Sequence, residues 1–162
     1  MSACALCGCI GAGQCETCGI PLDARVFDHS TIQDAPKLLG EEKVLASYAL
    51  HRNYCGVLCF FAQFTDRFAR DPARGVTTPG YQWQIRCDRQ PLDPYLTFGH
   101  IINPWGLDGF PVDVRLSEGC TVEFTIRNVG PPTPEDVLER VGGRILGRHW
   151  YDTRFGGTPR RL

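Results

Sequence analysis

The chain has 162 residues, of which 43% are hydrophobic and 22% charged, and its formal net charge is −1. These values are typical of a soluble globular protein with one ordinary domain plus a small appendage, and they exclude a disordered chain. No apolar run approaches the ~20 residues of a membrane-spanning helix, and no basic segment followed by an apolar stretch marks a secretory signal. The near-neutral charge gives no overall reason to expect nucleic-acid binding.

Residues 1–22 hold five of the nine cysteines. Four of them form two C-x2-C pairs, each followed by a glycine that relieves the tight turn round an ion. Four thiolates close a tetrahedral zinc shell and leave no position for water, which is typical of a structural site. Because this segment has little apolar material, the bound ion would supply its folding energy. We predict a zinc-knuckle-like segment over residues 1–22, with zinc bound by Cys4, Cys7, Cys15 and Cys18.

Two alternatives stay open for this cluster. The segment could be disulfide-linked or reduced and metal-free, and the fifth thiol, Cys9, could replace a ligand, cross-link or stay free. The string CALCGC also resembles the metal claw of nitrile hydratase alpha subunits, in which three cysteine sulfurs bind iron or cobalt. The matching residues would be Cys4, Cys7 and Cys9. The hydroxyl-bearing positions of that motif are missing here, at Ala5 and Gly8.

The next part of the chain is harder to assign. Residues 23–42 are polar and are predicted to form a connector. Residues 43–68 are strongly apolar, and their period fits either a helix or two strands with a turn near residues 53–56. The strand interpretation is favoured, with Val57, Cys59 and Phe61 on one face. Residues 69–80 are rich in turn-forming residues and are predicted to be a loop.

Strict alternation of apolar and polar residues marks the rest of the chain. It predicts strands over residues 81–87, 95–102, 110–116 and 120–128. Pro134 and the acids that follow it predict a short helix over residues 134–141. A last strand over 142–152 precedes a basic tail.

Short strands separated by glycine and proline at about ten-residue spacing are typical of an all-β domain. The predicted fold is therefore mainly β: an antiparallel β-sandwich or jelly roll over residues 43–152, with the cysteine-rich segment before it and a basic tail over residues 153–162.

The remaining cysteines and the histidines show no local metal motif. Cys55 and Cys59 are expected to be small buried apolar residues. Cys87 and Cys120 lie on the inward faces of their strands and are expected to be core thiols, with a disulfide between facing strands as the alternative. No H-x-H or H-E-x-x-H pattern links the four histidines, which are His29, His51, His100 and His149.

The stretches YQWQIRCDRQP, EGCTVEFTIRN and GGRILGRHWYD resemble small β-sandwich proteins of tailed-phage particles. Such proteins serve as capsid decoration, neck or tail accessory components, so the resemblance implies a non-enzymatic role. Its implied location is the virion, and its partners are other protein subunits in a homo- or hetero-oligomer. Trp105, Trp150 and Tyr151 are candidate interface anchors, with ordinary core filling as the alternative.

We therefore expect a structural interaction protein with no catalytic or cofactor-binding residues and with structural zinc. Two alternatives remain at this point. One is a metal-dependent enzyme, centred on the cysteine cluster or on scattered histidines; the alternative location of the protein is the cytoplasm. The other is a regulatory zinc-finger protein that contacts nucleic acid through its arginine-rich tail.

Overall fold

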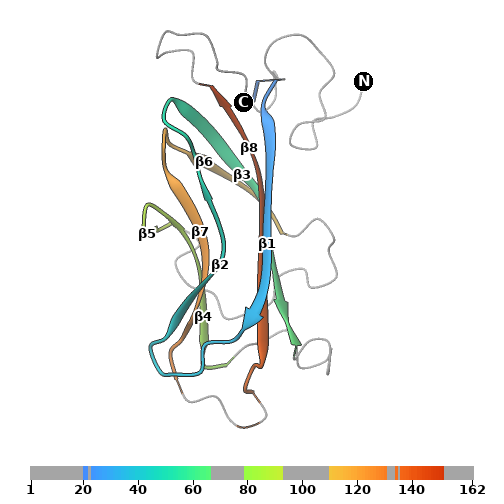
Figure 1. Ribbon diagram of the computed structural model, residues 1–162, viewed down its shortest axis with the longest axis vertical. Helices are drawn as coiled ribbons and strands as arrows, with labels where there is room; N and C mark the ends of the chain where they lie inside the picture. The colour runs from blue at the N-terminus through green and yellow to red at the C-terminus, as the bar shows by residue number, and fades with distance from the viewer. Residues whose placement is uncertain are drawn as a thin grey trace.

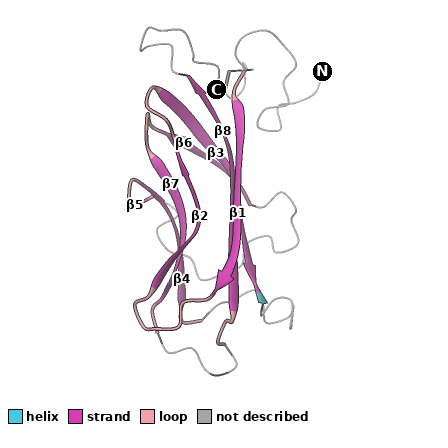
Figure 2. Ribbon diagram, in the orientation of Figure 1, coloured by secondary structure: helices cyan, strands magenta, loops and turns pink. Residues whose placement is uncertain are grey.

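The computed structural model describes residues 20–21, 23–66, 79–92, 110–130, 134 and 136–151. These residues form two antiparallel four-stranded sheets (Figures 1 and 2). The first sheet has the strand order β1-β8-β3-β6 and the second has the order β2-β7-β4-β5. The strands are β1 (Arg25–Asp34), β2 (Glu42–Ala49), β3 (Tyr54–Thr65), β4 (Tyr81–Cys87), β5 (Gln90–Pro91), β6 (Phe110–Leu116), β7 (Thr121–Asn128) and β8 (Arg140–Tyr151).

The mainly β, antiparallel architecture predicted from the alternation is confirmed. Most strands lie beside partners that are distant in the sequence. The first strand of the structure pairs with the last over ten residues, from Arg25 opposite His149 to Asp34 opposite Arg140. Apart from the short hairpin between β4 and β5, each connection leads from one sheet to the other.

The hydrophobic core lies between the two sheets. Tyr81, Trp83 and Ile85 of β4 are buried while the residues between them are half-exposed, as their alternation predicted. Trp83 lies against Phe124 of β7 with the ring centroids 5.8 Å apart. The first sheet contributes buried apolar side chains from all four of its strands, including Phe27, Leu58, Phe61, Val112, Leu116, Val141 and Ile145.

The ambiguous apolar stretch consists of two strands, β2 and β3. The turn between them ends at Asn53, which has a positive φ of 67°, and Gly56 is already inside β3. One prediction for this stretch was wrong. A β-bulge at Cys59 shifts the register against β8, so Phe61 joins the core between the sheets while Val57 and Cys59 pack on the outer face. A bulge adds one residue and therefore reverses the alternation that follows it.

Two further predictions need correction. The stretch predicted as a connector contains the ten-residue strand β1. Only Phe27 of this edge strand is buried, so the sequence carries no alternating pattern there. The helix predicted over residues 134–141 is also wrong, because Arg140 and Val141 already belong to β8 and pair with Asp34 and Gln33. None of the other described residues in that range is helical.

Several predictions fall outside the described residues: nearly all of the cysteine-rich segment, most of the loop at 69–80, the strand at 95–102, Trp105 and the basic tail at 153–162. In the part of the chain that the structure describes, no helix is long and apolar enough to cross a membrane.

Candidate functional site

The four predicted zinc ligands, Cys4, Cys7, Cys15 and Cys18, lie outside the described residues, as does Cys9. The chain that follows them is anchored on the outer face of the first sheet. There Ile20 is fully buried and packs with Ala24, Val57 and Cys59. Among the described side chains, no three His, Cys, Asp or Glu residues come close enough to hold a metal ion.

Three of the four histidines meet three tyrosines at one end of the sandwich. We call this group the histidine–tyrosine cluster. Its members come from β1, from β2 and the turn that follows it, and from the paired ends of β3 and β8; they are His29, His51, His149, Tyr48, Tyr54 and Tyr151.

His149 is at the centre of this cluster. Its Nδ1 is hydrogen-bonded to the Tyr48 hydroxyl, and the edge of Tyr54 approaches its ring with the centroids 5.7 Å apart. Tyr48 in turn stacks on Phe27, with a centroid distance of 4.2 Å and an interplanar angle of 7°. The hydrogen bond between Tyr48 and His149 therefore joins the two sheets, since Tyr48 belongs to β2 and His149 to β8.

Burial keeps both partners of this hydrogen bond neutral. Desolvation lowers the pKa of His149, and the nearby charges of Arg25 and His51 lower it further. Desolvation also raises the pKa of Tyr48, and Tyr54 adds to that rise. The Nδ1 of a neutral imidazole can accept a hydrogen bond from the hydroxyl of a neutral phenol. The pair can thus fix the relative position of the sheets or hold a proton between them.

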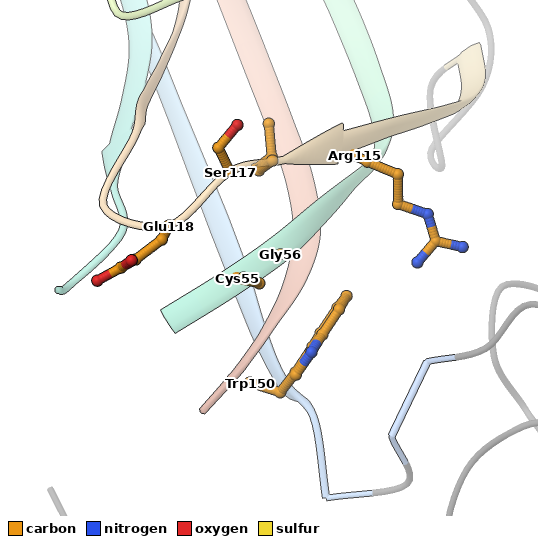
Figure 3. Close-up of a pocket in the computed structure, with 7 residues that line it drawn as sticks. Cys55, Gly56, Arg115, Ser117, Glu118 and Trp150 are labelled. Carbon is orange, nitrogen blue, oxygen red and sulfur yellow. The ribbon is translucent and has the colours of Figure 1, made fainter. Parts of the chain in front are cut away.

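A second feature is a pocket of about 440 Å³ on the outer side of the first sheet. Its lining includes Cys55, Arg115, Ser117, Glu118 and Trp150. Figure 3 shows the Trp150 indole and the Arg115 guanidinium on one side of β3, with Glu118 on the other.

The charged groups of this pocket have neighbours in the fold. Arg115 Nε lies 3.5 Å from Asp113 Oδ1, and Glu118 Oε1 accepts a hydrogen bond of 2.8 Å from the backbone N–H of Asn53. Trp150 also packs against the buried group formed by Ile20, Val57 and Cys59. A half-buried tryptophan and an arginine side by side are typical of protein–protein contacts.

None of the four described cysteines is in a disulfide. Cys59 is buried, as predicted, whereas Cys55 is only half-buried and lines the outer pocket. Cys120 is buried in the core between the sheets, and the half-buried Cys87 packs against the same core. The thiols of Cys87 and Cys120 are hydrogen-bonded to each other. They lie in neighbouring strands of one sheet and not, as the alternative supposed, in facing strands.

Comparison with protein-family models, with curated proteins and with solved structures gives no match to this chain.

The histidine–tyrosine cluster was not found from the sequence. Tyr48 and His149 are 101 residues apart, and each stands alone among apolar or polar neighbours that give no motif. They meet only because β2 of the second sheet packs against β8 of the first. The contact of Cys87 with Cys120 had a weak signal, because alternation placed both residues on inward faces.

Proposed function

We propose that this protein is a non-enzymatic structural component that assembles into a larger particle through a jelly-roll sandwich. Two sheets with the strand orders 1-8-3-6 and 2-7-4-5 support the jelly-roll assignment, because eight strands that alternate between two sheets are the arrangement of that fold. Jelly rolls build viral capsids, and they also occur in lectins and cupins. Because one fold serves all of these functions, the fold alone does not decide among them, and the proposal has to rest on features of the surface of this chain.

The observation that carries the proposal is a group of exposed aliphatic and aromatic side chains, which we call the apolar end. Leu38 and Leu39, in the connection between β1 and β2, are 72% and 74% exposed. This connection is tied to the end of β7 by the hydrogen bond from Gly40 N to Asn128 O, of 2.8 Å. The other exposed members of the apolar end are Ile32, Phe64, Val129 and Val137.

The members of the apolar end come from neighbouring strand ends. Ile32 of β1 and Phe64 of β3 flank Gly142 of β8, which has no side chain to separate them. Exposed apolar side chains that lie side by side, as Ile32 and Phe64 do across Gly142, mark interaction surfaces in soluble proteins. Because the side chains of Leu38 and Leu39 are apolar and largely exposed, their burial against another subunit would be favourable.

The particle that we propose is a tailed-phage virion, in which the chain would be a capsid decoration, neck or tail accessory component. This rests on the resemblance of residues 81–91, 118–128 and 142–152 to such proteins. We also propose that Cys4, Cys7, Cys15 and Cys18 hold a structural zinc ion that stabilises the amino-terminal segment. The spacing of the two C-x2-C pairs supports this assignment.

Sedimentation equilibrium of the full chain tests assembly through the apolar end. We expect the wild-type chain to self-associate and the double variant Leu38→Asp/Leu39→Asp to be monomeric, because a buried carboxylate opposes association. The control is Val26→Asp, which also places a carboxylate at an exposed apolar residue (56% exposed) but in β1 opposite Arg148, at the other end of the sandwich. It should associate like the wild type. A wild-type chain that stays monomeric up to about 100 µM, well above the Kd of a micromolar interface, would contradict the proposal.

A further inference from the structure

The contact between the Cys87 and Cys120 thiols is a reactive feature that the proposed function does not use. Cys87 is the last residue of β4, and Cys120 directly precedes β7. In the β4–β7 ladder Cys87 lies opposite Val122, so Cys120 is its diagonal neighbour two residues along. Residues in this relation share one face of a sheet, and here their thiols are hydrogen-bonded.

The backbone around the two cysteines is fixed by hydrogen bonds. Asp88 N donates to Thr121 O at 2.9 Å, and Asp88 Oδ1 accepts from Thr121 N at 2.8 Å. On the other side of the pair, Leu50 N donates to Cys120 O at 2.9 Å. Asp88 and Arg89 both have positive φ, as in a two-residue hairpin turn. The fold therefore holds the two cysteines next to each other.

The two thiols differ in accessibility and in acidity. Cys87 is half-buried beside the hairpin turn, whereas Cys120 is only 1% exposed. The hydrogen bond from Cys120 lowers the pKa of Cys87, and the same contact together with burial raises the pKa of Cys120. An accessible thiol that is stabilised as the thiolate is the one that reacts with an external disulfide, and a second thiol beside it can resolve the product.

We propose that Cys87 and Cys120 are a redox-active pair that forms a reversible disulfide by exchange with a low-molecular-weight disulfide such as glutathione disulfide. The Cys87 thiolate attacks one sulfur of glutathione disulfide, forms a mixed disulfide and displaces one glutathione thiolate. Cys120 loses its proton to that thiolate and attacks Cys87 Sγ, which expels the second glutathione. Two protein thiols are oxidised, and one glutathione disulfide is reduced to two molecules of glutathione.

The bond would join β4 to β7 inside the core and leave the chain otherwise in place. Cys87 and Cys120 are diagonal neighbours on one face of the sheet and pack in the same core, so the bond would form between side chains that the fold already places next to each other. A covalent link between residues far apart in the sequence restricts the unfolded chain. We therefore expect the oxidised protein to unfold at a higher urea concentration than the reduced protein.

Peptide mapping of the full chain tests the pair directly. The reduced protein is incubated with glutathione disulfide, free thiols are blocked with N-ethylmaleimide, and the chain is cut with trypsin. Arginines at positions 86, 89, 115 and 127 release Cys87 and Cys120 on separate short peptides. We expect these two peptides to be joined, with a mass lower by about 2 Da than their sum, since two hydrogen atoms are lost.

Single variants identify the order of the two steps. Cys120→Ser should stop at the mixed disulfide on Cys87, and Cys87→Ser should react at Cys120 at least about tenfold more slowly because that thiol is buried. The matched control, Cys55→Ser in the other sheet, should give the joined peptides at the wild-type rate.

The proposal is overturned if the wild-type chain leaves both cysteines unmodified, stops at the mixed disulfide, or joins either cysteine to a different partner. The wild-type map alone decides this if a variant does not fold.

Discussion

The imidazole of His149 is kept neutral by its surroundings, which makes the stability of the fold dependent on pH. Its pKa in the folded protein is lowered from 6.5 by burial, by Arg25 and by His51. A group with a depressed folded pKa binds more protons in the unfolded chain, so its contribution is fully present above pH 6.5 and is lost as the pH falls through the lower folded value. We expect the urea midpoint to fall on acidification from about pH 8 to about pH 5, the range in which histidine titrates.

His149→Gln separates this effect from the other titrations. The variant loses the hydrogen bond of the imidazole to Tyr48, so it should be less stable at high pH, and its midpoint should depend less on pH than that of the wild type. His29→Gln, at an exposed histidine that touches only the ring of Tyr48 within this cluster, is the control and should keep the wild-type slope. Equal slopes for the wild type and His149→Gln would show that another group causes the pH dependence.

At the scale of the elements, Phe27 of β1 and the backbone of β3 at Val57 come very close to Gly147 of β8. A Cβ atom at this residue would lie 2.3 Å from Phe27 Cζ and 2.3 Å from Val57 O. Phe27 can lie across β8 and stack on Tyr48 of the second sheet only because residue 147 has no side chain. The glycine therefore allows the contact that links β1, β8 and β2.

We predict that Gly147→Ala lowers the free energy of unfolding by about 1–3 kcal/mol, the usual cost of overfilling a packed core. Urea unfolding measures it. Gly130→Ala is the matched control, because a Cβ there has only Gly80 Cα as a neighbour, at 3.9 Å. The prediction would be wrong if the two variants had the same midpoint.

The elements that the sequence predicts well are those with an unbroken period. Alternation in β4 and β7 is uninterrupted, and both strands lie where it places them. The bulge at Cys59 and another irregularity between Val44 and Ala46 break the pattern in β3 and β2, so strict alternation placed Phe61 on the wrong face. Edge strand β1 buries one large side chain only, and this leaves no period to detect.

The candidate sites were less predictable than the strands, because they depend on which strands are neighbours. Nothing local in residues 134–141 shows that Arg140 and Val141 pair with β1, so a proline followed by acids suggested a helix instead. The same limit applies to Tyr48 and His149, which meet only because one sheet packs on the other. Local propensity predicts an element only where tertiary pairing does not override it.

For the whole molecule, the two ends of the sandwich differ in chemistry. The histidine–tyrosine cluster lies at the end where β8 finishes, and the apolar end lies where β8 begins. In the proposed assembly, the apolar end would be the surface through which the subunit joins its neighbours in a ring or as a cap on a larger particle. The opposite end is joined to the amino-terminal segment through Ile20.

Ile20, near the end of the proposed zinc segment, packs outside the core between the sheets, so the metal and the fold should be lost independently. Ile20 and Ala24 belong to the outer group with Val57 and Cys59, and none of these four is part of the core between the sheets around Trp83. We predict about one zinc ion per chain, which a strong chelator removes with the release of reactive thiols. Chelation should lower the free energy of unfolding by less than about 2 kcal/mol, the contribution of one side chain such as Ile20.

Metal analysis, thiol titration and urea unfolding followed by tryptophan fluorescence measure these three quantities on the same sample. Cys4→Ser/Cys7→Ser should lose the zinc and still unfold cooperatively, whereas Cys55→Ser should keep the zinc. Zinc that persists after Cys4 and Cys7 are replaced would refute the ligand assignment. A sandwich whose core does not depend on the zinc segment should still unfold as one cooperative unit after chelation. Loss of that cooperative transition would therefore show that the amino-terminal segment is needed for the core of the sandwich.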